Sequence, residues 1–203
     1  AIAPLVEGAN LVLSSGTGSG KTEAVMAPLI SRYRPSMNES GSLILLYVAP
    51  TKALVNDLEK RLKGPLDSLS IRLGIRHGDR DDLSRAQRPH VLITTPESLE
   101  VLHFRKDRAL ELVKALVIDE VHLLYNTQRG LQLAALINRI QQITSLPLQW
   151  VALSATIGNL GSIRDFLVGH DCPATLLSFP SDRPIDAYIK RTSNEREFQE
   201  TIS

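Results

Sequence analysis

A glycine-rich loop between an apolar run and a helical pattern constrains this chain more than any other feature. Leu11-Val12-Leu13 leads into a turn over residues 14–20, and Lys21-Thr22 then opens a helix. In this arrangement, backbone N–H groups and the positive end of the helix can bind a polyphosphate. The glycines permit the tight turn because they carry no Cβ that opposes positive φ.

The residue types in this loop predict a site for a nucleoside triphosphate and Mg²⁺. We expect the Lys21 ammonium to reach the β- and γ-phosphates and the Thr22 hydroxyl to ligate Mg²⁺. The strict pattern G-x-x-x-x-G-K-[ST] has glycine where this chain has Ser15. The alternative is a loop that binds nothing, but Gly-Lys-Thr after a strand has few purely structural uses. The predicted phosphate cradle comprises Ser15, Gly16, Thr17, Gly18, Ser19, Gly20, Lys21 and Thr22.

Apolar runs alternate with helical patterns along most of the chain. Strands are expected at residues 11–13, 43–48, 72–76, 91–94, 115–118, 150–153 and 174–179. Helices are expected at residues 22–34, 51–62, 130–143 and 159–167, with a short helix from Pro96, a helical stretch to Lys114 and a loop at residues 35–41. This alternation predicts an α/β fold, with a mostly parallel sheet of about seven strands and helices on both faces. Ligands of such sheets bind beyond the carboxyl ends of the strands.

Two acidic residues follow the expected strand at 115–118. In the segment Asp119-Glu120-Val121-His122, we expect Asp119 to hold Mg²⁺. Glu120 is expected to orient and deprotonate a water for attack on the γ-phosphate. The alternative is a solvated acidic turn, which becomes less favoured once the phosphate loop is considered. His122 is not expected to ligate a metal, because the other histidines form no ligand spacing with it.

Ser154-Ala155-Thr156 follows another apolar run. The two hydroxyls could bond to Asp119 or His122 and so report the state of a bound nucleotide. Judged alone, however, a Ser/Thr turn that caps the next helix explains the segment better.

Two further segments, Pro50-Thr51-Lys52 and Thr94-Thr95-Pro96-Glu97, each join a strand to a helix. Exposed helix N-termini with hydroxyl groups suit the phosphates of a nucleic acid, although ordinary helix capping explains them equally well. Between them lies a basic run without aromatic residues, which could follow a nucleic-acid backbone or form a solvated charged face. The run comprises Arg72, Arg76, His77, Arg80, Arg85, Arg88 and His90.

Net charge, cysteine content and the length of the apolar runs limit the kinds of protein that this chain can be. The formal net charge of +1 gives no global attraction to nucleic acid or to an anionic membrane. A single cysteine, Cys172, excludes an internal disulfide and fits a reducing compartment, so we expect a cytoplasmic protein. No apolar run approaches the length of a membrane span, and no signal peptide opens the chain. The start at Ala1 suggests a piece of something longer.

Taken in order, these segments resemble motifs I, Ia, Ib, II and III of superfamily 2 helicases. The matching residues are 15–22, 50–54, 95–99, 119–122 and 154–156, and their order and spacing agree from about residue 8 to residue 179. This family commonly has a residue other than glycine where Ser15 stands. The Asp-Glu-Val-His form and Arg129-Gly130 beyond it resemble the Lhr-like and Ski2-like branches more than the DEAD-box proteins, and we favour the Lhr-like branch.

This resemblance implies a first RecA-like domain over residues 1–180, with residues 181–203 as an edge element or a linker to a missing second RecA-like domain. The domain would bind ATP and Mg²⁺ through Lys21, Thr22, Asp119 and Glu120. His122, Ser154 and Thr156 would couple hydrolysis to strand movement. DNA or RNA would be contacted through Pro50, Thr51, Gly78, Thr95 and Pro96.

The resemblance also implies limits on this stretch of chain. The glutamine motif that contacts adenine in many relatives is not present, and neither is the second domain that supplies arginine fingers, which are worth about 10³–10⁵ in rate. We therefore expect these 203 residues to bind nucleotide, hydrolyse it poorly and not unwind alone. Three alternatives remain: a duplex translocase that does not unwind, a P-loop kinase or transporter ATPase, and a non-catalytic nucleic-acid-binding module.

Overall fold

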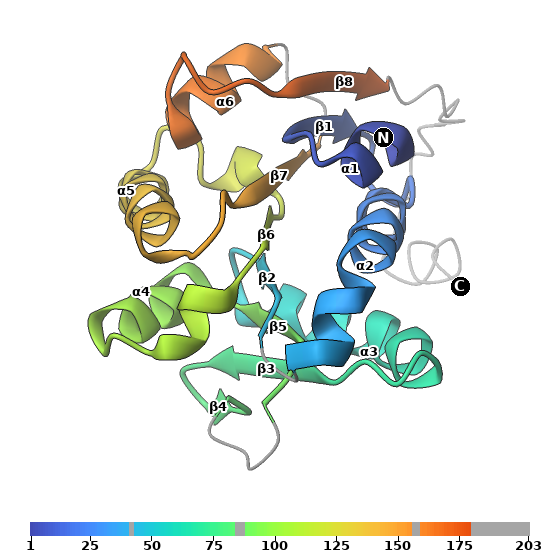
Figure 1. Ribbon diagram of the computed structural model, residues 1–203. Helices are drawn as coiled ribbons and strands as arrows, with labels where there is room; N and C mark the ends of the chain where they lie inside the picture. Colours follow the sequence, from blue (N-terminus) through green and yellow to red (C-terminus); the bar gives the residue numbers. More distant parts are fainter. Residues whose placement is uncertain (41–42, 84–87, 156–158, 180–203) are drawn as a thin grey trace, which may run out of the picture.

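The computed structural model describes residues 1–40, 43–83, 88–155 and 159–179 (Figure 1). Eight strands among these residues form one sheet in the order β4-β3-β5-β2-β6-β7-β1-β8. Every neighbouring pair is parallel except β3 with β4. The strands are β1 (Leu11–Ser15), β2 (Leu45–Val48), β3 (Leu73–His77), β4 (Arg80–Asp81), β5 (Val91–Thr94), β6 (Ala115–Ile118), β7 (Gln149–Ser154) and β8 (Thr175–Phe179).

Helices cover both faces of the sheet, as the alternation of patterns predicts. In Figure 1, α1, α2 and α3 lie on one side, and α4, α5 and α6 lie on the other. The α-helices are α1 (Ile2–Glu7), α2 (Lys21–Ser40), α3 (Lys52–Ser68), α4 (Pro96–Phe104), α5 (Gln128–Ile143) and α6 (Leu160–Val168). Two short 3₁₀ helices, η1 (Arg108–Leu112) and η2 (Val121–Leu123), flank β6.

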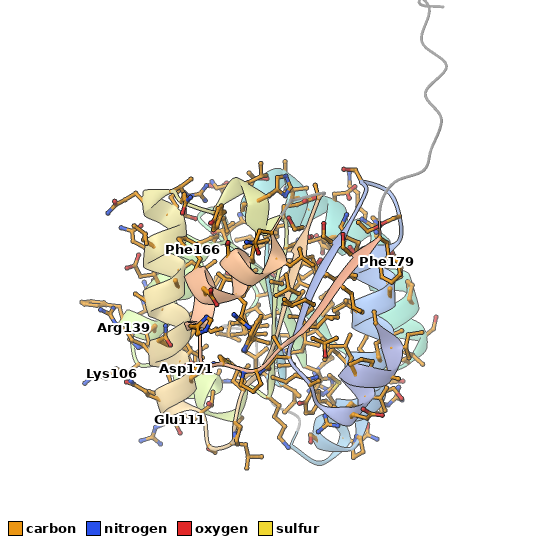
Figure 2. All side chains as sticks on the ribbon, turned by 90° about the horizontal axis from the view of Figure 1, so that it is seen from above. Lys106, Glu111, Arg139, Phe166, Asp171 and Phe179 are labelled. Atoms are coloured by element: carbon orange, nitrogen blue, oxygen red, sulfur yellow. The ribbon has the colours of Figure 1, made fainter. Side chains whose placement is uncertain are left out.

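Side chains fill the space between the helices and both faces of the sheet (Figure 2). The core on one face contains Val25, Leu29 and Leu58 from α2 and α3. The core on the other face contains Ile137 from α5 and the fully buried Trp150 from β7. All residues of β2, β5 and β6 are buried, because a central parallel strand has both faces covered. The apolar runs in the sequence have this origin.

Both long helices on the first face continue past a proline. The prediction of a loop at residues 35–41 is wrong in part, because α2 continues through Pro35 to Ser40. Similarly, α3 continues beyond residue 62 and through Pro65 to Ser68. Pro35 and Pro65 are exposed, whereas Met37 and Leu66 in the same turns are buried in the core. Packing of these apolar side chains offsets the cost of an internal proline.

The eighth strand, β4, is absent from the sequence prediction of about seven strands. It is a two-residue antiparallel extension of β3, in which Arg76 and His77 pair with Asp81 and Arg80. A strand of two polar residues produces no apolar run, so the hydrophobic pattern of the sequence could not predict it. Arg85, Thr156 and residues 181–203, which carry other predictions, lie outside the described residues.

The central strands are parallel, so their carboxyl ends lie together along one side of the sheet, at right angles to its edge strands. Ser14 is in register with Ser154, and Val48 is in register with both Ile118 and Thr94. The segments that follow these strands therefore emerge side by side. They are the phosphate loop, residues 50–52, Thr95-Pro96, Asp119-Glu120 and Ala155.

Candidate functional site

The phosphate loop has the backbone form that its glycines predict. Gly18 and Gly20 have φ of 71° and 81°, a region that residues with a Cβ rarely adopt. Lys21 is the first residue of α2 and is buried. Its Nζ donates to the carbonyl oxygens of Ser15 at 2.6 Å and Gly16 at 3.0 Å. The ammonium thus lies over the loop, where anionic oxygens of a ligand could replace these two carbonyls.

The buried hydroxyl of Tyr47 joins the loop helix to the acidic segment. It donates to Asp119 Oδ2 at 2.7 Å, and it also shares a hydrogen bond with the side chain of Thr22. The other carboxylate oxygen, Asp119 Oδ1, accepts from the backbone N–H of Glu120 at 2.8 Å. The two predicted metal ligands therefore meet at one phenol, although they are almost a hundred positions apart in the chain.

Tyr47 was not among the residues predicted from the sequence. The sequence did hold a clue to Tyr47, because it is the only hydroxyl-bearing residue in the apolar run at 43–48. A buried phenol near the carboxyl end of a central strand needs a hydrogen-bond partner. Burial and the neighbouring Asp119 charge raise the pKa of Tyr47 well above its usual value, so it remains a neutral donor.

Burial raises the pKa of Asp119, because a desolvated carboxylate is disfavoured. The hydrogen bonds from Tyr47 and the Glu120 N–H, and the positive charges of Lys21 and Arg61, offset this effect only in part. The buried Asp119 carboxylate and the Thr22 hydroxyl, both bonded to Tyr47, form an all-oxygen donor set whose negative charge is only partly compensated. Hard divalent cations such as Mg²⁺ prefer such donors, so these residues fit the predicted metal.

Replacing Asp119 with asparagine is expected to raise the thermal unfolding midpoint by a few degrees at neutral pH, because it removes a buried charge. In the unmodified protein the pKa of Asp119 is higher in the folded state than in the unfolded state. The free energy of unfolding therefore falls as the pH rises from the unfolded pKa through the folded pKa. The advantage of the variant should therefore be absent below about pH 4 and grow as pH rises. Thermal unfolding without nucleotide tests this, with the exposed Asp67→Asn as control; a pH-independent difference would contradict it.

The Glu120 carboxylate lies beside His122, whose ring nitrogen can either accept or donate a hydrogen bond. Its backbone is left-handed, with φ of 44°, a strained form for a non-glycine residue that is common at functional sites. Glu120 Oε2 lies 3.2 Å from His122 Nδ1, which also accepts from the Ala155 N–H at 3.3 Å. Nδ1 cannot serve both partners in one protonation state: without a proton it accepts from Ala155, and with one it can donate to Glu120. In the accepting state, Glu120 Oε2 is buried without a hydrogen-bond partner in the described chain.

Ser154 does not form the hydrogen bond to Asp119 or His122 that its position in the sequence allowed. Ser154 Oγ is buried and has no partner among the described residues, whereas the next backbone N–H, that of Ala155, reaches His122. The main chain after β7, not this hydroxyl, makes the contact with the acidic segment. Thr156, the second residue expected to couple the two segments, lies outside the described residues.

The segments predicted to contact nucleic acid lie beyond β2, β3 and β5. Thr51 caps α3 by accepting from the Leu54 N–H at 3.3 Å. Thr95 occupies the N-cap position of α4 without a side-chain capping bond to that helix, and Pro96 is its first residue. Gly78 lies beside the first of these loops, because a Cβ there would be 3.4 Å from Lys52 Nζ.

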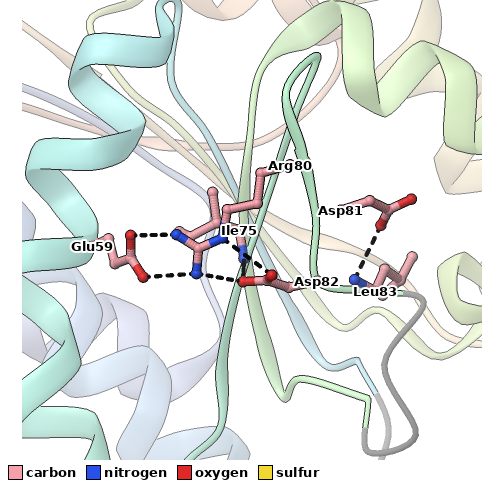
Figure 3. A network of polar contacts seen from close by, with 6 residues as sticks. All are labelled: Glu59, Ile75, Arg80, Asp81, Asp82 and Leu83. Atoms are coloured by element: carbon pink, nitrogen blue, oxygen red, sulfur yellow. Dashed lines mark hydrogen bonds and ion pairs between the residues drawn. The ribbon is translucent and has the colours of Figure 1, made fainter.

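The described part of the basic run is largely satisfied within the protein. Arg80 forms ion pairs with Asp82 and with Glu59, which lies on α3 (Figure 3), and these partners raise its pKa above the usual value. Arg76 pairs with Asp81, and Arg88 lies 3.4 Å from Asp107. Of the two interpretations of this run, the structure favours a charged face held by internal pairs over a phosphate-binding stripe.

A family model for DEAD/DEAH box helicases matches residues 1–163. The chain belongs to the DEAD/DEAH box helicase family. Its similarity to the Lhr-like branch is confirmed by relatives named ATP-dependent helicase Lhr-Core. The relative from Methanocaldococcus jannaschii is 35% identical over 96% of this chain and 26% of its own length. The relative from Methanothermobacter thermautotrophicus is 34% identical over 84% of this chain and 22% of its length.

Solved structures place this helicase domain among RecA-like folds. The Mycobacterium smegmatis helicase Lhr bound to ssDNA and AMP-PNP matches with a TM-score of 0.80 and 31% identity, over 98% of this chain and 29% of that one. The DEAD-box helicase Mss116 bound to ssRNA and UDP-BeF shares the fold, with a TM-score of 0.76 and 20% identity over 89% of this chain and 38% of that one. This helicase domain thus spans less than two-fifths of each protein compared. Within its described residues, no helix has the length and apolar character to cross a bilayer.

Proposed function

We propose that residues 1–180 are the ATP-binding motor domain, the first RecA-like domain, of an ATP-dependent helicase that acts on DNA or RNA. The convergence of Thr22, Asp119 and Tyr47 is the single observation that carries this proposal. The Lys21 charge acts on the same carboxylate, and Glu120 follows it directly. A helicase motor needs these groups around one nucleotide.

In the proposed site, the loop N–H groups of residues 16–20 and the Lys21 ammonium bind the phosphates of ATP, and Thr22 and Asp119 hold Mg²⁺. When bound, Mg²⁺ would neutralise charge on the phosphate oxygens. Lys21 exchanges its bonds to Ser15 and Gly16 for phosphate oxygens. The Glu120 carboxylate orients a water molecule and accepts its proton at Oε2, the atom without a hydrogen-bond partner among the described residues.

His122 and the segment that follows β7 would report hydrolysis to the rest of the motor. Once Glu120 Oε2 carries the proton taken from water, it can donate that proton in a hydrogen bond to His122 Nδ1. Nδ1 has a single lone pair and then cannot also accept from the Ala155 N–H, so this contact is lost when ATP is hydrolysed. Ser154 and Thr156 flank this contact in the chain. We assign the three residues His122, Ser154 and Thr156 to coupling on this basis.

The nucleic acid would bind along the same side of the sheet, through Pro50, Thr51, Gly78, Thr95 and Pro96. We further propose that residues 181–203 lead to a second RecA-like domain, which would supply arginine fingers, and that the protein is cytoplasmic. The 203-residue chain alone is then expected to bind nucleotide, hydrolyse it slowly and leave duplexes intact. Robust turnover by this chain alone, stimulated by nucleic acid, would contradict that expectation.

ATP turnover by the full-length protein tests the proposal. Single-stranded DNA, RNA and duplexes are compared at one fixed salt concentration, because affinity for nucleic acid depends steeply on salt. We expect at least one of them to stimulate turnover, and a strand-displacement assay then separates a helicase from a translocase that does not unwind. Turnover that ignores every nucleic acid would count against a helicase motor.

A further inference from the structure

Arg129 joins two of the proposed nucleic-acid segments, although it belongs to neither. It is the second residue of α5, and its Nη2 donates to the Pro50 carbonyl oxygen at 2.8 Å. Its Nε donates to Glu97 Oε1 at 2.7 Å, and Nη2 lies 2.7 Å from the same oxygen. The guanidinium therefore bridges the loop after β2 and the first turn of α4.

The two partners of Arg129 mark the places where the nucleic-acid backbone would bind. Pro50 is one of the proposed contacts and precedes Thr51, and Glu97 directly follows Thr95-Pro96. These segments follow β2 and β5, which are neighbours in the sheet. A planar guanidinium has donors in a fixed geometry, so it can hold the two loops at a set separation.

The start of α5 is also packed against the segment that follows the catalytic carboxylates. A Cβ on Gly130 would lie 2.0 Å from the Leu124 carbonyl oxygen, so the two backbones are in close contact. The Thr127 hydroxyl donates to that oxygen at 2.7 Å and accepts from the Gly130 N–H at 3.1 Å. Only η2 separates Leu124 from Glu120, so Arg129 is connected to the ATP site by short, hydrogen-bonded backbone.

Glu97 faces Arg129 as a carboxylate at neutral pH. Burial opposes ionisation of Glu97, but its own backbone N–H, Arg129 and Thr95 outweigh this effect and lower its pKa. The side chains are 45% and 58% exposed. Because an ion pair this exposed adds little to overall stability, its main effect is on the position of the loops.

We propose that Arg129 is a positioning residue that holds the two nucleic-acid loops together and joins them to the segment carrying Glu120, so that nucleic acid stimulates ATP hydrolysis. This inference rests on the proposed function. It gives a role to Arg129-Gly130, a pair that contributes to the resemblance to Lhr-like helicases but that the sequence alone does not explain.

Arg129→Ala in the full-length protein tests the inference. A single-stranded DNA oligonucleotide and an RNA of the same sequence are titrated while ATP turnover is measured. We expect the half-saturating concentration to rise about tenfold, within the usual range of coupling between sites, while turnover without nucleic acid and the KM for ATP remain unchanged. Arg129→Lys should restore little, because a single ammonium cannot reproduce the fork. Arg139→Ala, on the same helix and exposed, is the matched control (Figure 2).

Two comparisons keep the inference falsifiable. Glu97→Gln removes the ion pair from the other side, and the double variant should match Arg129→Ala if both act through one contact. Titration curves within about twofold of the unmodified protein would overturn the inference, since coupling between sites is at least fivefold. So would an equal loss of turnover with and without nucleic acid together with a lower unfolding temperature, because that marks a merely structural residue. Absence of stimulation in the unmodified protein would instead overturn the proposed function.

Discussion

Glu120→Gln is expected to lower ATP turnover by the full-length protein about 10³-fold, because the proposed general base is removed. The variant keeps the shape of the side chain and the left-handed backbone at this position, where φ is 44°. Nucleotide affinity should therefore remain close to that of the unmodified protein. Steady-state turnover, together with binding of a fluorescent ATP analogue, measures the two effects separately.

Glu111→Gln is the matched control for this experiment. Glu111 (labelled in Figure 2) is an exposed carboxylate in η1, which precedes β6, whereas Glu120 follows that strand. Its variant should hydrolyse ATP at the unmodified rate. Full hydrolysis by Glu120→Gln would reject the assigned role and favour the alternative of a non-catalytic nucleic-acid-binding module.

Gly130→Ala should destabilise the domain by about 3 kcal/mol, at the upper end of the usual cost of overpacking. The new methyl would lie 2.0 Å from the Leu124 carbonyl oxygen and 2.9 Å from Phe166 Cζ. The oxygen is backbone and accepts from Thr127, so it cannot move aside without breaking the turn that begins α5. Thermal unfolding should show a midpoint about 6–12 °C lower for a domain of this size.

Gly64→Ala provides the opposite expectation on another helix. Gly64 lies in the interior of α3, and an added Cβ would meet nothing within 4 Å. Alanine there should raise stability by roughly 0.5–1 kcal/mol, because glycine is a poor helix former. If both substitutions change the free energy of unfolding by the same amount, the close contact with Leu124 is not the reason that glycine is needed at position 130.

The site residues that could be predicted from the sequence are those in short motifs that follow an apolar run. Asp119 directly follows the buried strand β6, and Lys21 follows β1 and the glycine-rich loop. Buried runs locate the carboxyl ends of parallel strands, so the sequence places both residues at the same end of the sheet, where the charge of Lys21 acts on Asp119. Tyr47 and Arg129 contact residues that are distant in the chain, so only the register of β2 with β6 and the packing of α5 reveal their roles. The sequence allowed a bond from the Ser154 hydroxyl to His122, but the backbone N–H of Ala155 makes that contact instead.

Errors in the predicted fold have a similar origin. Pro35 and Pro65 favour loops by local chemistry, but burial of Met37 and Leu66 in the same turns keeps the helices intact. The basic run illustrates the same limit for charge. Its spacing does not show that carboxylates from α3 and from the run itself neutralise Arg80.

A structure of the full-length protein with Mg²⁺ and a non-hydrolysable ATP analogue tests the central claim most directly. We predict that Lys21 Nζ leaves the carbonyl oxygens of Ser15 and Gly16 for the phosphates, and that the metal lies between the Thr22 hydroxyl and the Asp119 carboxylate. Glu120 should then face the γ-phosphate. A nucleotide bound elsewhere, with Lys21 still bonded to its own loop, would contradict the account.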